Sequence, residues 1–240
     1  MKIITWNCNM AYRKKAAIIL QHQPDIVVVQ ECEHPDKLLF SAETKKPTGL
    51  LWFGNNNNKG LGIFSYSEFK LKLHPSYNEA FKWVVPIKVT GNGANFILYA
   101  VWANNPDDKD GQYVTQVWKA LQYYSRHIKK KNTILTGDFN SNTIWDRPRR
   151  QGNHSHVVDV LAAKKIYSTY HRHFTQEQGK ENDPTFYLYK NKSKPYHLDY
   201  CFVSSDLMER LASVEVGEFN NWRQYSDHVP LIITFNSLTL

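Results

Sequence analysis

The sequence has few of the features that mark secreted or membrane-spanning proteins. Its 240 residues include three cysteines, Cys8, Cys32 and Cys201, in apolar surroundings and without the spacing of zinc ligands. This small, odd number indicates reduced, buried thiols and a cytoplasmic protein rather than a disulfide-stapled domain. No apolar run approaches the roughly 20 residues of a membrane-spanning helix, and the amino-terminal residues lack the pattern of a signal peptide. We therefore expect no membrane anchor.

Internal repeats, linkers and low-complexity segments are also lacking, so residues 1–240 are predicted to form one domain, and we expect a monomer. The 14 tyrosines, 12 phenylalanines and 7 tryptophans exclude a disordered chain. A formal net charge of +8 favours anionic partners, namely nucleic acid, phosphorylated metabolites or an anionic membrane surface. The charge does not choose among these partners, and it equally fits a basic but inert surface.

Strand and helix signals alternate along the chain. Strands are predicted at residues 3–9, 26–31, 61–66, 83–89, 95–102, 133–135, 185–189, 196–203, 213–216 and 229–235, and helices at 14–21, 112–130 and 156–164. The three strands between residues 61 and 102 are expected to form an antiparallel meander. Residues 107–110 are predicted to cap the long helix. Residues 45–59 are expected to be loop-rich, with the asparagine run 55–58 as a solvated turn.

Polar side chains adjoin the apolar strands at many places. They are Asn7, Asn9, Glu31, Asp138, Asn140, Asp199, Asp227 and His228. A polar group beside a buried strand is costly unless it is satisfied, so this recurrence indicates a site. Carboxylate and amide oxygens are hard ligands that suit Mg²⁺ or Mn²⁺ rather than zinc. A carboxylate beside a histidine would fix its tautomer and support its charged form.

The segment 136–140 illustrates the ambiguity of each motif alone. Residues i and i+2 of an extended segment share a face, so Asp138 and Asn140 are expected to lie side by side, with Phe139 turned into the packing. The same residues are ordinary turn formers, and the segment by itself leaves both interpretations open.

Together the motifs resemble those of the endonuclease/exonuclease/phosphatase superfamily, which includes exonuclease III and the abasic-site endonucleases. They are Trp6-Asn7-x-Asn9, Gln30-Glu31, Gly137-Asp138-Phe139-Asn140, His197-Leu198-Asp199-Tyr200 and Ser226-Asp227-His228, in the family's order. The resemblance implies an α/β fold, a four-layer α-β-β-α sandwich of two mixed, largely antiparallel sheets. It also implies a site at one end of the sheets.

The resemblance further implies a Mg²⁺ or Mn²⁺ ion bound mainly by Glu31. Asn7 and Asp227 would be nearby ligands of the metal or the phosphate, and Asn9 would support the metal site. These residues form the expected metal-binding set.

The expected catalytic set matches the remaining motifs. Asp138 and Asn140 would orient the attacking water and the phosphate, and His228 would be the catalytic histidine with Asp199 as its partner. Whether Asp138 or the His228–Asp199 pair is the general base stays open.

One position departs from the family pattern. Many members carry a histidine or tyrosine at the end of the strand that corresponds to residues 97–102, whereas this sequence has neither there. Asn104 is the expected site residue at this point, as a phosphate contact. The acid that protonates the leaving group is left without an assignment.

Two loops beside the motifs are expected to rim the site and bind substrate. One carries Trp145, Arg147 and Arg149, and the other carries Trp222 and Arg223. A tryptophan with arginines can stack a base and hold backbone phosphates, although a loop anchored by its tryptophan would look the same. Histidines at positions 154, 156, 171 and 173 are expected at the surface.

Three functions remain open. The preferred hypothesis is a metal-dependent phosphodiesterase acting on DNA as an endonuclease or exonuclease, by in-line attack of water. The second is a phosphatase or phosphodiesterase of small molecules or lipid headgroups. The third, disfavoured because every metal and histidine position is filled, is a nucleic-acid-binding protein with an inactive site.

Overall fold

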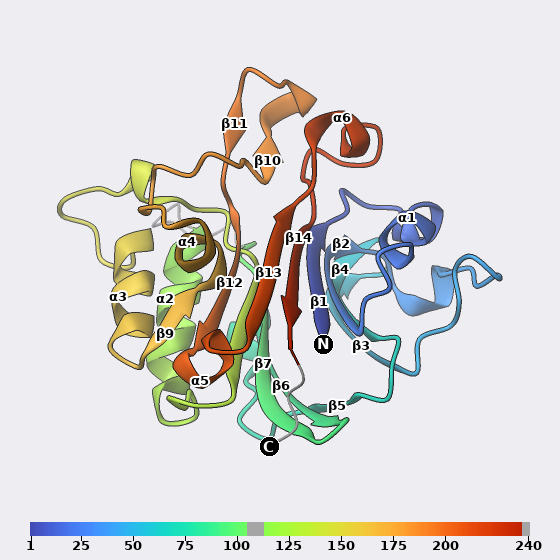
Figure 1. Cartoon of the computed structure of the whole chain (residues 1–240), viewed down its shortest axis with the longest axis horizontal. Helices are drawn as coiled ribbons and strands as arrows, with labels where there is room; N and C mark the ends of the chain where they lie inside the picture. The colour runs from blue at the N-terminus through green and yellow to red at the C-terminus, as the bar shows by residue number, and fades with distance from the viewer. Residues whose placement is uncertain (105–112, 237–240) are drawn as a thin grey trace.

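The computed structural model describes residues 1–104 and 113–236, in which two six-stranded sheets lie face to face (Figure 1). The first sheet has the strand order β13 (Leu211–Val216), β14 (Leu231–Phe235), β1 (Lys2–Asn7), β2 (Ile26–Cys32), β4 (Lys59–Ser65), β3 (Gly49–Asn56). The second has the order β5 (Lys70–Leu73), β6 (Val84–Gly91), β7 (Ala94–Trp102), β8 (Thr133–Asp138), β12 (Asp199–Ser204), β9 (Ile166–Ser168). The pairs β1–β2 and β7–β8 are parallel, and the other neighbours are antiparallel.

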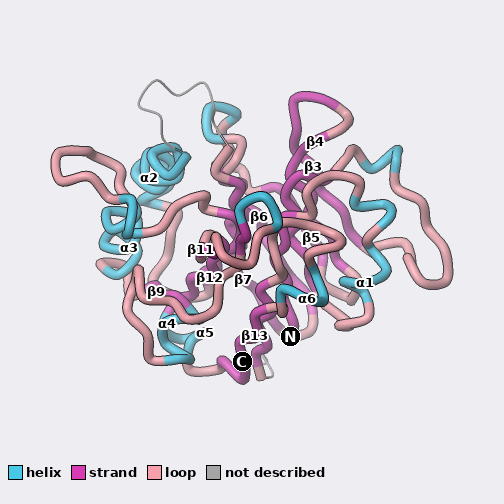
Figure 2. Tube along the Cα trace, turned by 90° about the horizontal axis from the view of Figure 1, so that it is seen from above, coloured by secondary structure: helices cyan, strands magenta, loops and turns pink. Residues whose placement is uncertain are grey.

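Helices cover the outer faces of both sheets (Figures 1 and 2). The helices are α1 (Ala16–Leu20), α2 (Tyr113–Tyr123), α3 (His154–Ala162), α4 (Thr169–Phe174), α5 (Ser205–Met208) and α6 (Phe219–Trp222). Val117 of α2 and Leu161 of α3 pack on Leu135 of the second sheet, whereas α1 and α6 lie against the first sheet. The α/β fold and the four-layer arrangement are therefore confirmed.

The core follows from the period-two alternation of the central strands. Ile3 and Val28 point between the sheets and share one buried cluster with Leu98. Their neighbour Ile4 points outward and packs in another cluster with Ile19 of α1. Strands buried on both faces need apolar residues at every position, which explains the continuous β-branched run in β2.

Several predicted elements differ from the structure. β3 lies within the segment expected to be loop, because its half-buried edge position does not require a strong β-branched pattern. The predicted meander is wrong at its start, since β4 belongs to the first sheet whereas β6 and β7 belong to the second. The long helix was expected to reach residue 130, but α2 ends at Tyr123, and a 3₁₀ turn follows to Arg126. Its predicted cap at 107–110 lies outside the described residues.

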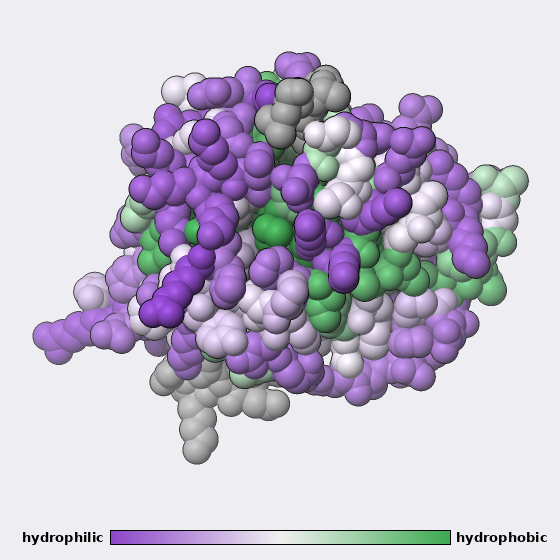
Figure 3. All heavy atoms as spheres, turned by 90° about the horizontal axis from the view of Figure 1, so that it is seen from below, coloured by the Kyte–Doolittle hydropathy of each residue, from purple (hydrophilic) through white to green (hydrophobic). Residues whose placement is uncertain are grey.

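A two-stranded arm, β10 (Phe186–Tyr187) and β11 (Pro195–Tyr196), projects beyond one end of the sheets (Figure 1). The opposite end presents a mostly hydrophilic surface with apolar areas near its middle (Figure 3). The three cysteines are buried and unpaired, as predicted. Within the described residues, none of the helices has the length and apolar character needed to cross a membrane.

Candidate active site

Strands from both sheets bring their polar ends together beneath the arm. Asp138 ends β8 and Asp199 begins the antiparallel strand β12, and the two are direct cross-strand partners. In the other sheet, β1 ends at Asn7 next to Gln30 of β2, one residue before Glu31. Residues far apart in the chain thus meet because these strand ends, from both sheets, lie at the same end of the sandwich.

Asn7 links the two sheets. Its Nδ2 donates to Asp138 Oδ2 at 3.0 Å and lies 3.4 Å from Glu31 Oε1. Its Oδ1 accepts from the backbone N–H of Asn9 at 3.1 Å. The strand predicted at residues 3–9 would reach Asn9, but β1 ends at Asn7 and Asn9 has a left-handed φ of 49°. The backbone of Asn9 therefore orients the Asn7 amide.

Glu31 lies at an irregularity of β2. The pairing of β2 with β4 shifts register between Gln30 and Cys32, and Glu31 has a φ of 58°. A bulge of this kind re-aims a side chain at the edge of a sheet. The Glu31 carboxylate forms an ion pair with Lys59 of β4, at 3.1 Å between Oε1 and Nζ. The sequence motifs gave no indication of Lys59.

Asp138 and Asn140 lie side by side as predicted. Asn140 donates to Asp138 through its backbone N–H, at 2.8 Å, and through Nδ2, at 3.0 Å. Nδ2 also lies 3.1 Å from the Ala103 carbonyl oxygen, which ties the motif to the end of β7. Gly137 is required beneath the pair, since its φ is +151° and a Cβ there would lie 1.8 Å from the Val101 carbonyl oxygen.

His228 is held on several sides. Its Nδ1 lies 2.8 Å from Asp199 Oδ2, which confirms the predicted contact. Its backbone N–H donates to Ser226 Oγ, and its carbonyl oxygen accepts from the Trp6 indole N–H, each at 3.0 Å. The ring of Phe186, from the arm, packs 4.6 Å from the imidazole. Sequence reasoning missed the supporting roles of Ser226 and Phe186.

Burial and mutual charge set the protonation of this group. Burial has the largest single effect on the pKa of His228 and lowers it. The Asp199 carboxylate, together with Asp138 and Asp227, more than offsets burial and raises this pKa to about 10. Burial raises the pKa of Asp138 to about 7, opposed by His228 and assisted by Asp199. The histidine is therefore an imidazolium at neutral pH, next to a carboxyl group that titrates near neutrality.

The oxygen atoms present fit a divalent cation. Asp138, Asp199 and His228 each offer one atom within a cluster 4.8 Å across, and Asp199 Oδ1 is buried without a hydrogen-bond partner in the described part of the chain. Because a protonated histidine cannot ligate a metal, carboxylate and amide oxygens such as those of Glu31 and Asn7 are the suitable donors at this end of the sheets. Among the described residues, no hydrogen bond or ion pair links Asp227 to Glu31.

A cavity of about 440 Å³ opens beside Asn140. Trp145, Arg147 and Phe186 contribute to its lining. Trp145 is 44% exposed and packs against Tyr196 of the arm, with 4.9 Å between ring centroids. This cavity is the place where the first predicted rim loop meets the site. Arg149 of that loop is exposed.

The second predicted rim loop differs from expectation. Trp222 lies in α6 with only 5% of its surface exposed, and it packs against Trp6 at 5.2 Å between ring centroids. It cannot serve as a stacking platform, because its faces belong to the core. Arg223 is exposed and extends over the ring of Phe219 at 5.9 Å. Asn104, two residues after the end of β7, is half-buried.

A buried polar network holds the loop that follows Asn140. Asn142 Nδ2 lies 3.1 Å from Glu181 Oε2, and His171 pairs with Glu181 Oε1 at 3.0 Å. Ser141 Oγ lies 2.7 Å from Nδ1 of His154, whose side chain is fully buried. The expectation that His154 and His171 lie at the surface is therefore wrong. Both side chains support the loop after Asn140, His154 through Ser141 and His171 through Glu181.

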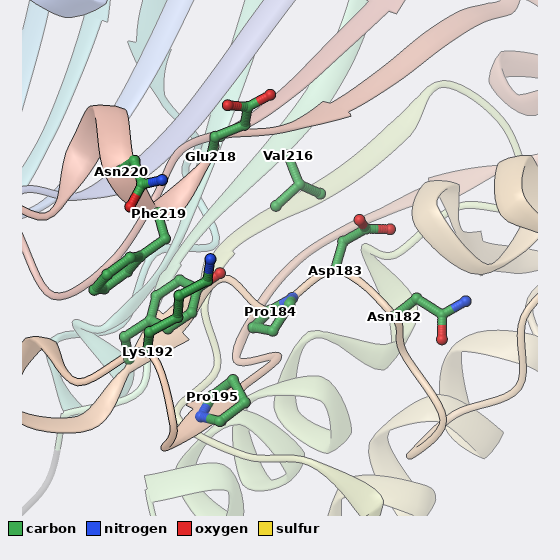
Figure 4. Close-up of a pocket in the computed structure, with 11 residues that line it drawn as sticks. Asn182, Asp183, Pro184, Lys192, Pro195, Val216, Glu218, Phe219 and Asn220 are labelled. Carbon is green, nitrogen blue, oxygen red and sulfur yellow. The ribbon is translucent and has the colours of Figure 1, made fainter.

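A second cavity, of about 430 Å³, lies on the other side of the arm (Figure 4). Asp183, Lys192, Glu218 and Phe219 contribute to its lining (Figure 4), as does Tyr187. Since Phe186 packs on His228 and the next residue, Tyr187, lines this cavity, the arm separates the cavity from the candidate active site.

Comparisons with known proteins agree with this architecture. NExo from Neisseria, described as a 3′ phosphatase and solved with a product DNA hairpin, is 21% identical over 98% of this chain and 99% of its own, with a TM-score of 0.71. An AP endonuclease from Archaeoglobus fulgidus is 17% identical over 98% and 99%, also with a TM-score of 0.71. The endonuclease domain of TRAS1, a telomere-specific non-LTR retrotransposon, is 14% identical over 98% of each chain, with a TM-score of 0.68. Identities this low show a common fold.

A search of curated protein sequences gave no significant match. A model of the Endonuclease/Exonuclease/phosphatase family, in contrast, matches residues 4–228. This match begins in β1, includes Asn7, Glu31, Asp138 and Asp199, and ends at His228. Enzymes of that family hydrolyse phosphoester bonds and generally use divalent metal ions. The chain belongs to the endonuclease/exonuclease/phosphatase family.

Proposed function

We propose that this protein is a divalent-metal-dependent phosphodiesterase that hydrolyses DNA. The observation that carries the proposal is the meeting of two hydrogen-bonded groups at one end of the two sheets. Asp138 is bonded to Asn7 and Asn140 at 2.8–3.0 Å, and His228 is bonded to Asp199 at 2.8 Å. A carboxylate, an amide and a charged histidine held this closely suit a phosphate and the water that attacks it.

The electrostatics assign different roles to the two titrating groups. With a pKa of about 10, His228 is charged before substrate binds and presents its Nε2–H to a phosphate oxygen. Asp138, with a pKa of about 7, is poised to accept the proton of an attacking water. Asn140 would hold the phosphate beside that water. This division makes Asp138 the general base and His228 the group that stabilises negative charge.

The expected cofactor is Mg²⁺ or Mn²⁺, which would neutralise the phosphate and stabilise the leaving oxygen when bound. Glu31 and Asn7 would hold it, with Asp227 as a further ligand and Asn9 orienting the Asn7 amide. The bulge at Glu31 supports this assignment, because it aims a carboxylate out of the strand instead of leaving it in the ladder.

The surroundings favour a nucleic acid over a small phosphoester. Trp145 and Arg147 line the cavity beside Asn140 and offer an aromatic face with a positive charge. The turn of the arm carries Tyr189, which is 81% exposed, with Lys194 5.6 Å from the centre of its ring. A DNA strand bound at the site would therefore meet aromatic and basic side chains from the loop after Asn140 and from the arm.

The test is an activity screen with Mg²⁺ and Mn²⁺ on abasic DNA, duplex and single-stranded DNA, RNA and a panel of phosphomonoesters. We expect cleavage of DNA that a chelator abolishes. The His228→Ala and Glu31→Gln variants should lose it while they remain folded. Full activity in either variant would contradict the assignment of that residue.

The small-molecule alternative rests on the 440 Å³ cavity, whose size also fits a phosphorylated metabolite or a lipid headgroup. Arg147→Ala and Arg149→Ala distinguish the two functions. Loss of a phosphate contact away from the scissile bond should weaken the binding of DNA but not the binding of a small phosphomonoester. Lys129→Ala, which removes a charge from the segment after α2, is the matched control. Activity confined to soluble phosphomonoesters would overturn the proposal of DNA as substrate.

A further inference from the structure

The ion pair between Lys59 and Glu31 is a feature of the site that the proposed mechanism does not use. Lys59 Nζ lies 3.1 Å from Glu31 Oε1, and the side chains are 38% and 19% exposed. The same oxygen is also 3.4 Å from Asn7 Nδ2. Among the ion pairs of the described residues, those of Lys59 and His228 are the two that reach carboxylates of the candidate site.

Lys59 is held at this position from two directions. Its backbone belongs to the first sheet, where it pairs with Asn56 at the turn between β3 and β4. Its ammonium also lies 5.4 Å from the centre of the Trp102 ring, at the end of β7 in the second sheet. A cation–π contact of this kind favours a lysine that reaches from the first sheet to the second over one that extends into solvent.

We propose that Lys59 is an internal counter-ion of Glu31 that a divalent metal ion must displace from Oε1. The inference rests on the proposed function, since it takes Glu31 as a metal ligand. Mg²⁺ binds carboxylate oxygens at about 2.0–2.1 Å. An ammonium group near 3 Å from the same oxygen would then face a double positive charge at close range, so the two cations exclude each other there.

The displacement sets the metal affinity. Without metal, Lys59 offsets the negative charge that Glu31 contributes beside Asp138 and Asp199. Each metal-binding event breaks this ion pair, so the free energy of the pair is subtracted from the free energy of metal binding. The partial exposure of both side chains lets the exchange occur without rearrangement of the strands. After displacement, the Trp102 ring remains as a partner for the ammonium.

The experiment measures Mn²⁺ binding to the metal-stripped full-length protein by titration calorimetry. Lys59→Met keeps the aliphatic stem and removes the charge, and we expect it to tighten Mn²⁺ binding about threefold to fivefold, the upper part of the range of an exposed ion pair. Lys59→Arg keeps the charge and should stay within about twofold of the wild type. In a thermal unfolding scan, Mn²⁺ should raise the Tm of Lys59→Met more than that of the wild type.

Lys82 provides a matched control. Its Nζ lies 5.6 Å from the centre of the Trp83 ring and 3.6 Å from Glu79, so Lys82→Met removes an equivalent charge without touching Glu31. We expect wild-type Mn²⁺ affinity in this variant. An equal gain in both methionine variants would show an effect of net charge and would overturn the inference. Unchanged or weaker binding in Lys59→Met would also overturn it.

Glu31→Gln separates this inference from the proposed function. If Glu31→Gln weakens Mn²⁺ binding but Lys59→Met has no effect, the inference fails and the proposed function stands. If Glu31→Gln binds Mn²⁺ as the wild type does, Glu31 is not a ligand, and both its assignment and the inference fail.

Discussion

The pairing of His228 with Asp199 gives a prediction that can be measured without substrate or metal. The imidazole Nδ1 lies 2.8 Å from Asp199 Oδ2, and the two side chains are 5% and 0% exposed. Asp199→Asn preserves shape and hydrogen bonding but removes the negative charge. The imidazole would then lose the strongest of the effects that raise its pKa. Burial would still lower that pKa, and only Asp138 and Asp227 would oppose burial.

The magnitude follows from linkage between protonation and folding. The pKa of His228 is about 10 in the folded protein and about 6.5 in an unfolded chain. A raised pKa stabilises the fold fully below about pH 6.5, and this stabilisation is lost as pH rises through about 10. At roughly 1.4 kcal/mol for each pKa unit, the limiting contribution is about 5 kcal/mol. We expect Asp199→Asn to lower the free energy of unfolding by about 3–5 kcal/mol near pH 6 and by much less near pH 10.

The assay is urea unfolding of metal-stripped protein at several pH values between about 6 and 10. Asp206→Asn is the control, since that carboxylate accepts from the backbone N–H of Asn132. It should change stability by a similar amount at each pH. A wild-type stability that does not fall between about pH 6.5 and 10 relative to Asp199→Asn would refute the assignment of His228 as a buried imidazolium.

Further predictions concern individual side chains. Gly137→Ala should destabilise the protein by more than about 4 kcal/mol in thermal or urea unfolding, because its Cβ would overlap the Val101 carbonyl oxygen. Ser226→Ala should cost about 1–3 kcal/mol and lower kcat more than it raises KM, because the His228 backbone N–H loses its acceptor. Trp145→Ala should raise KM for DNA with little change in stability, whereas Trp222→Ala should cost about 3–5 kcal/mol of stability. The reverse outcome for the two tryptophans would contradict their placement.

Much of the site was predictable because the polar residues interrupt apolar strands. Asp138 and Asn140 follow a buried run, and the predicted contact between them is present. It forms through a turn and not along an extended segment, because β8 ends at Asp138 and Asn140 has a left-handed φ of 46°. The pairing of His228 with Asp199 was predictable only through the family resemblance, because 29 residues separate the two in sequence. The burial of Trp222 was not predictable, because a tryptophan on a short segment beside a motif has the same local pattern whether it faces solvent or core.

The sequence by itself determined the strand pattern of the central sheets, the buried thiols and the set of polar strand ends, since each depends on neighbouring residues along the chain. Only the tertiary structure decided that β3 and β4 share a sheet with β1, that His154 is buried and that His171 is largely covered, with 9% of its side chain exposed. It also decided that Lys59 meets Glu31 across neighbouring strands. These contacts depend on strand order and on a register shift at Glu31, and neither leaves a local pattern in sequence because both are set by the packing of segments far apart in the chain.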